Sequence, residues 1–262
     1  MDIILFHKFW ISTDTRLGSW NVSTEQPSEK ERDNAKQVLS YFVSKGWDRR
    51  AIYAMIGNMQ GESTINTAYI QATRRGLLPN GAASLEDVPN TVMQYFYYGN
   101  PEYTPTGSKR AHGIGLTQWD GDTTTYGYRQ QKLVGMAMNL GKDWYDPFYQ
   151  LYRIDYESTH NLQWHTDRYQ FDGKNWVWED FIHPLPKYTT KYLAWVFKAY
   201  YENSDGDYEP RQVNAEWWEN YFANYTPPPW SEQPLSLVAA LLGTNKKHGK
   251  QKIIRKVGYN GY

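Results

Sequence analysis

The chain has 262 residues, of which 40% are hydrophobic and 21% charged, a composition that fits one sizeable globular domain with extensions or two small domains. The formal net charge is zero, so no overall basic field favours nucleic acid as the substrate. Cysteine is absent, which excludes disulfide bonds, zinc–thiolate sites and cysteine nucleophiles.

Residues 1–32 are predicted to form a polar, irregular N-terminal extension. The stretch from Met1 to Trp10 is only partly apolar and lacks both a basic start and a small-residue cleavage site, so we expect no secretory signal. No apolar run approaches the roughly 18–20 residues that a membrane span needs. The sequence therefore predicts no membrane span.

Two helices are predicted at the start of the main domain, which we place at residues 33–226. Apolar residues recur at helical spacing from Asp33 until Gly46 ends the element. Asp48 is the predicted N-cap of a second helix that runs towards Glu62. One face of that second helix is apolar and carries Ile52, Met55, Ile56 and Met59.

The middle of the chain is predicted to alternate between irregular segments and helices. Residues 63–110 are predicted as loops and short elements, and residues 113–119 as an extended or hairpin segment whose glycines permit close backbone approach. Residues 160–187 are Trp-rich and are predicted to be irregular, with room for a small strand pair. Further helices are predicted at residues 129–141, 146–157, 189–203 and 212–224.

Residues 227–262 are predicted to form a C-terminal tail that starts with the stiff break Pro227-Pro228-Pro229. The tail is basic, and Glu232 is its only acidic residue. One interpretation is a solvated tail, and the other is an anchor for an acidic polymer or protein.

Aromatic residues are abundant, with 12 Trp, 23 Tyr and 9 Phe that together make up 17% of the chain. Flat amphipathic rings suit the faces of sugars, and Tyr and Trp also offer a polar group. Core packing and protein–protein interfaces explain the same content equally well.

Glu62 is the first candidate for chemistry. It follows Met59, Met55 and Ile52 by three, seven and ten residues, which places its carboxyl at the end of the apolar stripe. Partial burial and the helix C-terminus both favour a proton on this carboxyl, as a glycosidic general acid requires. The alternative is a glutamate at a frayed helix end that faces water.

Two sequence blocks resemble the phage tail lysozyme family, a branch of the lysozyme-like superfamily. The segment from Ala54 to Asn66 is similar to a family helix that ends in Gly-Asn-x-x-x-Glu-Ser, in which the glutamate is the catalytic acid. The segment from Gly113 to Trp119 is similar to the family's Gly-x-Gly-Leu-x-Gln-Trp, which lines the sugar cleft. Two weaker blocks, at residues 150–157 and 197–202, follow in the expected order.

The resemblance implies a mainly α (α+β) fold, a lysozyme-like helical domain with a small β-hairpin at the cleft. It also implies that Glu62 is the catalytic acid and that Gln118 and Trp119 contact the substrate, by hydrogen bonding and by stacking on a sugar ring. Three further candidates near the substrate, each with an alternative role in capping or core packing, are Ser63, Tyr156 and Tyr200.

The second catalytic group is less defined. Asp120 and Asp122 follow the Gln-Trp pair, and either could serve as the base for a water molecule, although Asp120-Gly121 is also a common turn pair. Without a second carboxylate, the substrate's own N-acetyl or 6-hydroxyl group would take part, and attack by the hydroxyl would make the enzyme a lytic transglycosylase. The histidines form no zinc pattern, so we predict no metal and no cofactor.

The resemblance predicts a muramidase that cleaves the β-1,4 bond between N-acetylmuramic acid and N-acetylglucosamine in bacterial peptidoglycan. Its expected place is the virion, in a phage tail with other tail proteins, where it opens the wall during genome entry. The alternatives are a lytic transglycosylase, a non-catalytic wall-binding tail protein, a chitinase-like enzyme, and an endolysin that waits in the host cytoplasm. Residues 122–128 and 160–187 depart from the family pattern by their length.

Overall fold

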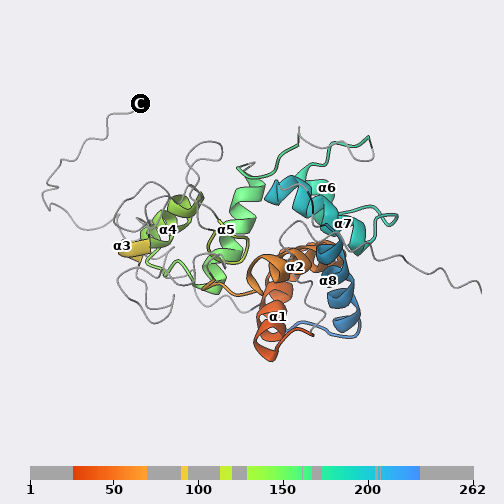
Figure 1. Cartoon of the computed structure of the whole chain (residues 1–262), viewed down its shortest axis with the longest axis horizontal. Coiled ribbons are helices and arrows are strands. Elements are labelled where there is room, and N and C mark those ends of the chain that lie inside the picture. The colour runs from red at the N-terminus through yellow and green to blue at the C-terminus, as the bar shows by residue number, and fades with distance from the viewer. Residues whose placement is uncertain are drawn as a thin grey trace, which may run out of the picture.

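The computed structural model describes residues 26–69, 90–93, 113–119, 129–160, 162–166, 173–203, 206 and 208–230, and these are mainly helical (Figure 1). This agrees with the predicted lysozyme-like helical fold. The helices are α1 (Glu29–Ser44), α2 (Arg49–Ser63), α3 (Asn90–Met93), α4 (Arg129–Asn139), α5 (Pro147–Thr159), α6 (Trp178–Ile182), α7 (Thr190–Phe197), the π-helix η3 (Lys198–Glu202) and α8 (Tyr208–Tyr221).

Helix α1 begins four residues before the predicted start at Asp33. Ser28 is its N-cap, and its hydroxyl accepts a hydrogen bond from the backbone N–H of Glu31. The Glu31 carboxylate in turn accepts one from the backbone N–H of Ser28 at 2.8 Å. This reciprocal cap starts the helix ahead of its first apolar residue, so the predicted boundary between residues 32 and 33 lies inside α1.

The other predicted helices are confirmed, with small shifts at their ends. Asp48 and Asp146 cap α2 and α5 as polar N-cap residues, and α8 begins four residues earlier than predicted. The 160–187 stretch contains the short helix α6, which its composition did not indicate. The described residues contain no strands, and the expected hairpin is represented by one antiparallel bridge between Ile114 and Trp119.

Helix α2 is the central helix of the described structure, with α1, α7 and α8 packed against it (Figure 1). Every residue from Ala51 to Met59 is buried, so this helix is covered on all sides rather than on one stripe. Gly57 permits the closest approach, because a Cβ atom there would lie 2.6 Å from the backbone nitrogen of Ala215 in α8. Glycine at this position therefore sets the distance between α2 and α8.

Aromatic side chains fill much of this core. Trp217 and Trp230 are partly exposed, and the other described tryptophans are buried. Core packing therefore accounts for most of the tryptophan in the described part of the chain.

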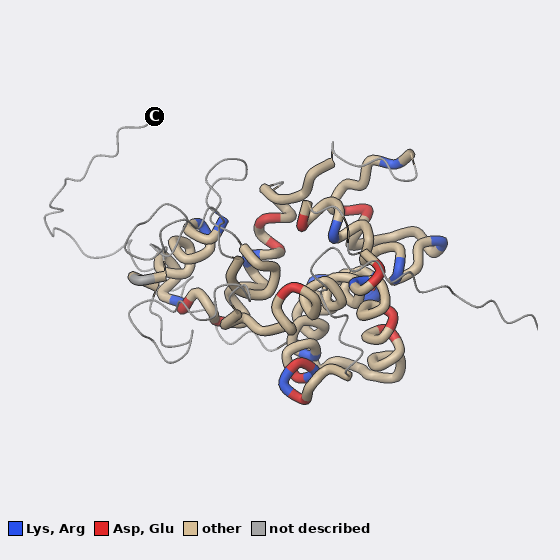
Figure 2. Tube along the Cα trace, viewed as in Figure 1, with Lys and Arg blue, Asp and Glu red and all other residues tan. Residues whose placement is uncertain are grey.

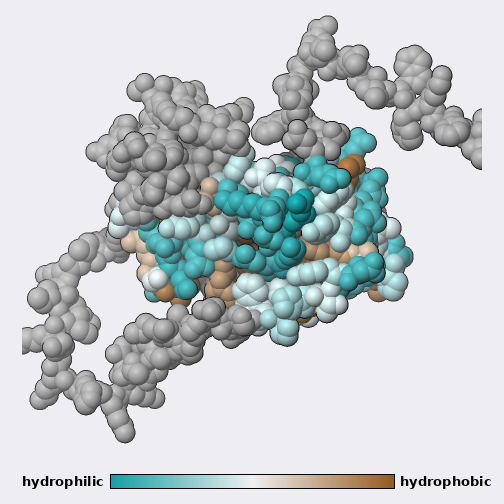
Figure 3. Space-filling model, turned by 90° about the horizontal axis from the view of Figure 1, so that it is seen from below, coloured by the Kyte–Doolittle hydropathy of each residue, from teal (hydrophilic) through white to brown (hydrophobic). Residues whose placement is uncertain are grey.

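Charged residues of both signs are scattered over the described trace (Figure 2). On the face seen from below, the apolar side chains reach the surface only in small areas (Figure 3).

The start of the predicted tail packs against the helical domain. The carbonyl of Pro228 accepts a hydrogen bond from the Ser40 hydroxyl at 2.8 Å. The Trp230 ring lies 5.4 Å from the Tyr41 ring and 6.0 Å from the Phe148 ring, measured between centroids. The rest of the tail, from residue 231, lies outside the described residues. Among the described helices, none combines the length and apolar character needed to cross a bilayer.

A buried carboxylate, Glu157 of α5, joins four segments. It accepts hydrogen bonds from the Trp119 indole at 3.0 Å and the Tyr201 hydroxyl at 2.9 Å. Arg153 pairs with it at 2.8 Å and Arg129 of α4 at 3.3 Å. Burial opposes the charge most strongly, but the two arginines and the two hydrogen bonds outweigh it and hold the pKa of Glu157 below its ordinary value.

We expect Glu157→Gln to lower the free energy of unfolding by about 3–5 kcal/mol, because it leaves two buried guanidinium groups without their counter-charge. Urea denaturation at pH 7 measures this change. The matched control is Glu179→Gln, whose side chain is 75% exposed, and we expect it to change stability by less than about 0.5 kcal/mol. Equal effects of the two substitutions would contradict the role assigned to Glu157.

The acid sensitivity of the fold follows from the lowered pKa of Glu157. This carboxylate stabilises the fold fully above the unfolded-state pKa of about 4.3, and that stabilisation is lost as the pH falls through the lower folded value. We therefore expect the urea midpoint of the unaltered chain to fall between pH 5 and the acid limit more steeply than that of Glu157→Gln. Parallel pH curves for the two proteins would argue against this linkage.

Candidate active site

Glu62 lies at the end of α2, one residue before the helix ends. The two residues that follow the helix, Thr64 and Ile65, adopt the left-handed conformation with φ of 52° and 53°, which ends the helix and turns the chain. The side chain of Glu62 is 25% exposed, so most of it is covered by protein while part of it remains reachable. The alternative of a frayed end that faces bulk water does not describe this carboxyl.

Two cations contact the same oxygen of Glu62. Arg211 of α8 donates from Nη2 to Oε1 of Glu62 at 2.5 Å, and Lys198 Nζ of η3 lies 3.9 Å from that oxygen. The side chains of Arg211 and Lys198 are only 12% and 4% exposed.

A second glutamate, Glu202 at the end of η3, belongs to the same cluster. Its side chain is 7% exposed, and its Oε2 lies 3.6 Å from Lys198 Nζ. Burial first, and then the charge of Glu62, raise the pKa of Glu202 to about 7, against the opposing effect of Lys198 and Arg211. The cluster of Glu62, Glu202, Lys198 and Arg211 therefore holds two carboxyls and two cations, drawn from α2, η3 and α8.

The local sequence of α2 explains how these elements come together. Asn58 donates from Nδ2 to the backbone carbonyl of Ala194 in α7 at 3.0 Å, and Gln60 accepts from the Trp218 indole of α8 at 2.8 Å. Gly61 leaves the space that Arg211 occupies, because a Cβ atom there would lie 1.0 Å from Arg211 Nη1. The residues around Glu62 thus orient α7, which η3 directly follows, and α8, so that Lys198 of η3 and Arg211 of α8 meet its carboxyl.

The turn from Gly113 to Trp119 packs against the end of α2. Ser63 donates to the backbone carbonyl of Leu116 at 3.0 Å, and Gln150 accepts from the backbone N–H of Leu116 at 2.9 Å. Gly115 has φ of +73°, and a Cβ atom there would lie 2.7 Å from the Gln150 amide, so only glycine fits. Ser63 and Gln150 therefore hold the turn close to the end of α2.

No group of His, Cys, Asp and Glu side chains among the described residues could hold a metal ion.

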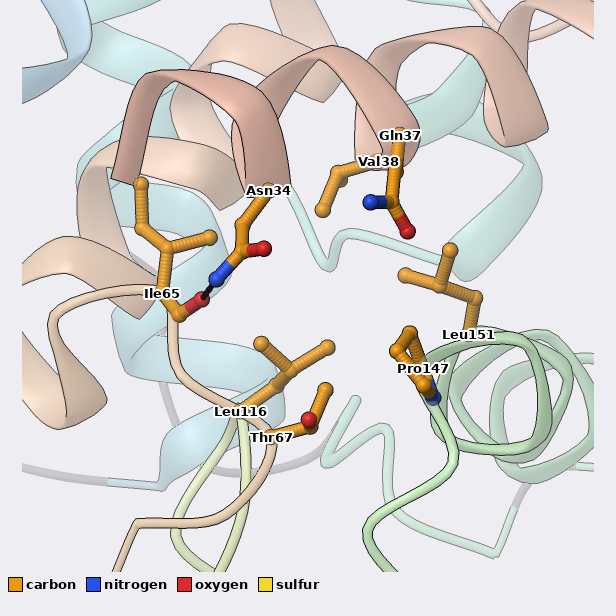
Figure 4. Close-up of a pocket in the computed structure, with 8 residues that line it drawn as sticks. All are labelled: Asn34, Gln37, Val38, Ile65, Thr67, Leu116, Pro147 and Leu151. Atoms are coloured by element: carbon orange, nitrogen blue, oxygen red, sulfur yellow. Dashed lines mark hydrogen bonds between the residues drawn. The ribbon is translucent and has the colours of Figure 1, made fainter. Parts of the chain in front are cut away.

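A separate apolar pocket lies between α1, the segment after α2, the Gly113–Trp119 turn and α5 (Figure 4). Glu62 is not among the residues that line it, which are Asn34, Gln37, Val38, Ile65, Thr67, Leu116, Pro147 and Leu151.

Comparison with known proteins identifies the family. Residues 33–222 match the family model described as phage tail lysozyme, which is well over half of the chain. The chain belongs to the phage tail lysozyme family. The matched residues include both the Glu62 block and the Gly113–Trp119 block, and the suspected family is confirmed.

The chain is also similar in sequence to a curated protein, Morphogenesis protein 1 of Bacillus phage B103. The two are 28% identical over 186 residues, which cover 71% of this chain and 38% of the relative. The chain thus spans well under half the length of that protein. The match associates the chain with phages.

The structure places the predicted substrate-binding residues as follows. Gln118 is half-buried, and its amide donates to the Gly115 carbonyl within its own turn at 2.9 Å. Trp119 is fully buried, with its indole N–H bonded to Glu157, so it would stack on a sugar only if it left this position. Their contact with substrate stays a prediction.

Ser63, Tyr156 and Tyr200 take different positions. Ser63 is buried and donates to the backbone carbonyls of Met59 and Leu116. Tyr156 is half-buried and stacks on His160, whereas Tyr200 is fully buried and bonds the carbonyl of Lys174. Asp120 and Asp122 lie outside the described residues.

Sequence reasoning missed Lys198, Glu202 and Arg211. Lys198 and Glu202 stand four residues apart in an otherwise apolar and aromatic stretch, and this isolated i, i+4 pair of opposite charges was a usable signal. Arg211 gave no such signal, because its partner Glu62 lies 149 residues away in the sequence.

The glycines of α2 give a matched pair of substitutions. Gly57→Ala would meet the backbone of Ala215, which cannot move alone, so we expect a loss of about 2 kcal/mol or more in the free energy of unfolding. Gly61→Ala would meet only the flexible end of Arg211, so we expect a change below about 1 kcal/mol. Urea denaturation compares the two.

The same Gly61→Ala variant tests what positions Arg211. We expect its crystal structure to show the Arg211 guanidinium displaced from the Glu62 carboxyl. Retention of the 2.5 Å contact, or a destabilisation equal to that of Gly57→Ala, would contradict the role given to Gly61.

Proposed function

We propose that this chain is a peptidoglycan-cleaving glycosidase, a muramidase that acts on the β-1,4 bond between N-acetylmuramic acid and N-acetylglucosamine. The observation that supports it is the position of Glu62, a partly exposed carboxyl at the end of a buried helix, in a chain of the phage tail lysozyme family. A carboxyl that is covered on one side and open on the other can hold a proton and still reach a substrate.

In this proposal Glu62 is the general acid. It donates its proton to the bridging oxygen as the glycosidic bond breaks and the electron pair moves to that oxygen. Asp120 is our candidate for the second carboxylate, which would act as a base for the attacking water. Gln118 and Trp119 are candidates for binding the sugar, with Ser63, Tyr156 and Tyr200 as supporting residues.

The proposed setting is a phage tail. The family name and the relative from Bacillus phage B103 support a particle-borne enzyme that opens the wall during genome entry, with other tail proteins as partners. An endolysin released from the host cytoplasm would use the same chemistry.

Glu62→Gln tests the catalytic assignment, because glutamine keeps the shape of the side chain but cannot donate a proton in this way. We expect at least about a 100-fold loss in the rate at which purified cell walls are cleared. The control is Glu209→Gln, an exposed glutamate of α8, which should clear walls at the unaltered rate. Undiminished clearing by Glu62→Gln would reject Glu62 as the acid, and no clearing by the unaltered chain would support a non-catalytic wall-binding protein instead.

Mass spectrometry of fragments from defined peptidoglycan tests the bond and the mechanism together. A muramidase yields reducing N-acetylmuramic acid ends, whereas a lytic transglycosylase yields anhydro products that are one water lighter. We expect the reducing products. Anhydro products would replace water by the substrate's 6-hydroxyl as the nucleophile and would remove the need for Asp120.

A further inference from the structure

We propose that Glu62 and Glu202 form a carboxyl dyad that holds one proton between them, and that Glu202 is the positioning residue that keeps this proton available to Glu62. The inference rests on the proposed function, since it assigns Glu62 the role of proton donor. It goes beyond that function because it explains where the proton is stored before the reaction.

The contacts of Lys198 bring the two carboxyls together. Its ammonium lies 3.9 Å from Oε1 of Glu62 and 3.6 Å from Oε2 of Glu202, so one cation stands beside both acids. Lys198 and Glu202 are four residues apart in η3, and the side chains of both are almost fully buried. Among the described residues, the cluster is therefore most covered on the η3 side and most exposed at Glu62.

Glu202 lacks the partners that a buried carboxylate needs. Neither of its oxygens accepts a hydrogen bond from any donor in the described part of the chain, and Lys198 lies beyond hydrogen-bond distance. Glu157 shows the contrast, because it is equally buried and is bonded by two arginines, an indole and a phenol. A buried acid without donors favours its neutral, protonated form.

The titration of Glu202 supports the same conclusion. The groups that face it are Glu62 from α2, Lys198 from its own helix and Arg211 from α8. Burial and the charge of Glu62 raise the pKa of Glu202 to about 7. Because both carboxyls lie beside the same ammonium and the charge of one raises the pKa of the other, the proton belongs to the pair.

The cations leave room for this proton. Arg211 donates to Oε1 of Glu62, and the Lys198 ammonium lies beside the same oxygen. Glu62 can therefore carry the proton on Oε2 without losing its bond from Arg211.

The proton balance of one turnover is closed. The shared proton moves onto Glu62, which gives it to the bridging oxygen as the glycosidic bond breaks, so that both carboxyls are left ionised. Water then forms the new bond to the sugar carbon, and the proton it loses restores the pair. The net reaction consumes one water molecule and leaves the dyad with one proton, as at the start.

The pH dependence of wall clearing tests the dyad with Glu202→Gln, which removes the second negative charge and leaves the cations. We expect the alkaline limb of the clearing rate to move down by about one pH unit, because the remaining acid loses the neighbour that holds its proton. Clearing on the acid side should stay within about threefold of the unaltered chain. Glu216→Gln, whose partner Lys191 is exposed, is the matched control on α8 and should leave the whole profile unchanged.

A purely structural role for Glu202 would lower the clearing rate at every pH and leave the alkaline limb in place, and that result would overturn the proposal. Infrared spectroscopy of the unaltered chain gives an independent measurement if Glu202→Gln fails to fold. We expect a protonated carboxyl band that titrates near pH 7, and its absence would also overturn the dyad.

The proposed function and the carboxyl dyad can be rejected independently of each other. If the unaltered chain does not clear walls, the proposed function fails, and the infrared titration still tests the dyad. If the chain clears walls and Glu62→Gln does not, but Glu202→Gln keeps the same alkaline limb, the function stands and the dyad is wrong.

Discussion

The buried carboxylate of Glu157 is the interaction on which the rest of the described structure depends. Its four partners come from the Gly113–Trp119 turn, α4, α5 and η3, so one charge fixes the positions of segments far apart in the sequence. Loss of any one of these partners would be destabilising, because it would leave part of the buried charge desolvated and unpaired. Tyr201, one of the four, directly precedes Glu202, and so the same contact sets the register of η3 at the candidate active site.

The two buried glutamates differ in how they are satisfied, and this difference separates structure from chemistry. Glu157 has donors on both oxygens and remains charged, whereas Glu202 has no donor in the described chain and faces a second acid. A fully bonded carboxylate gives rigidity, and an unbonded one beside another carboxyl gives a proton that can move. The π-helical turn of η3 carries Tyr201 and Glu202 side by side, so it joins the rigid cluster to the titrating one.

The helices and the candidate acid were predictable because their signals are local. Apolar spacing and polar caps indicated α1, α2, α4, α5, α7 and α8, and the Glu62 motif stands within one helix and its cap. The sequence could not show whether the Trp119 ring is free to stack on a sugar, because its indole is bonded to Glu157, 38 residues later. Composition also overstated the irregularity of residues 160–187, where the aromatic residues of α6 pack on Trp47, between α1 and α2, and on Phe197 of α7.

The sequence by itself determined the family and the order of the helices and indicated Glu62 as the candidate acid, since each of these depends on residues within a few turns of one another. Only the tertiary structure decided which charges meet that carboxyl. Lys198, Glu202 and Arg211 come from η3 and α8, and α2 receives them because Gly57 lets α8 approach and Gly61 leaves space for a guanidinium. Coulombic and hydrogen-bond energies depend on distances of a few ångströms in space, and separation along the chain does not encode those distances.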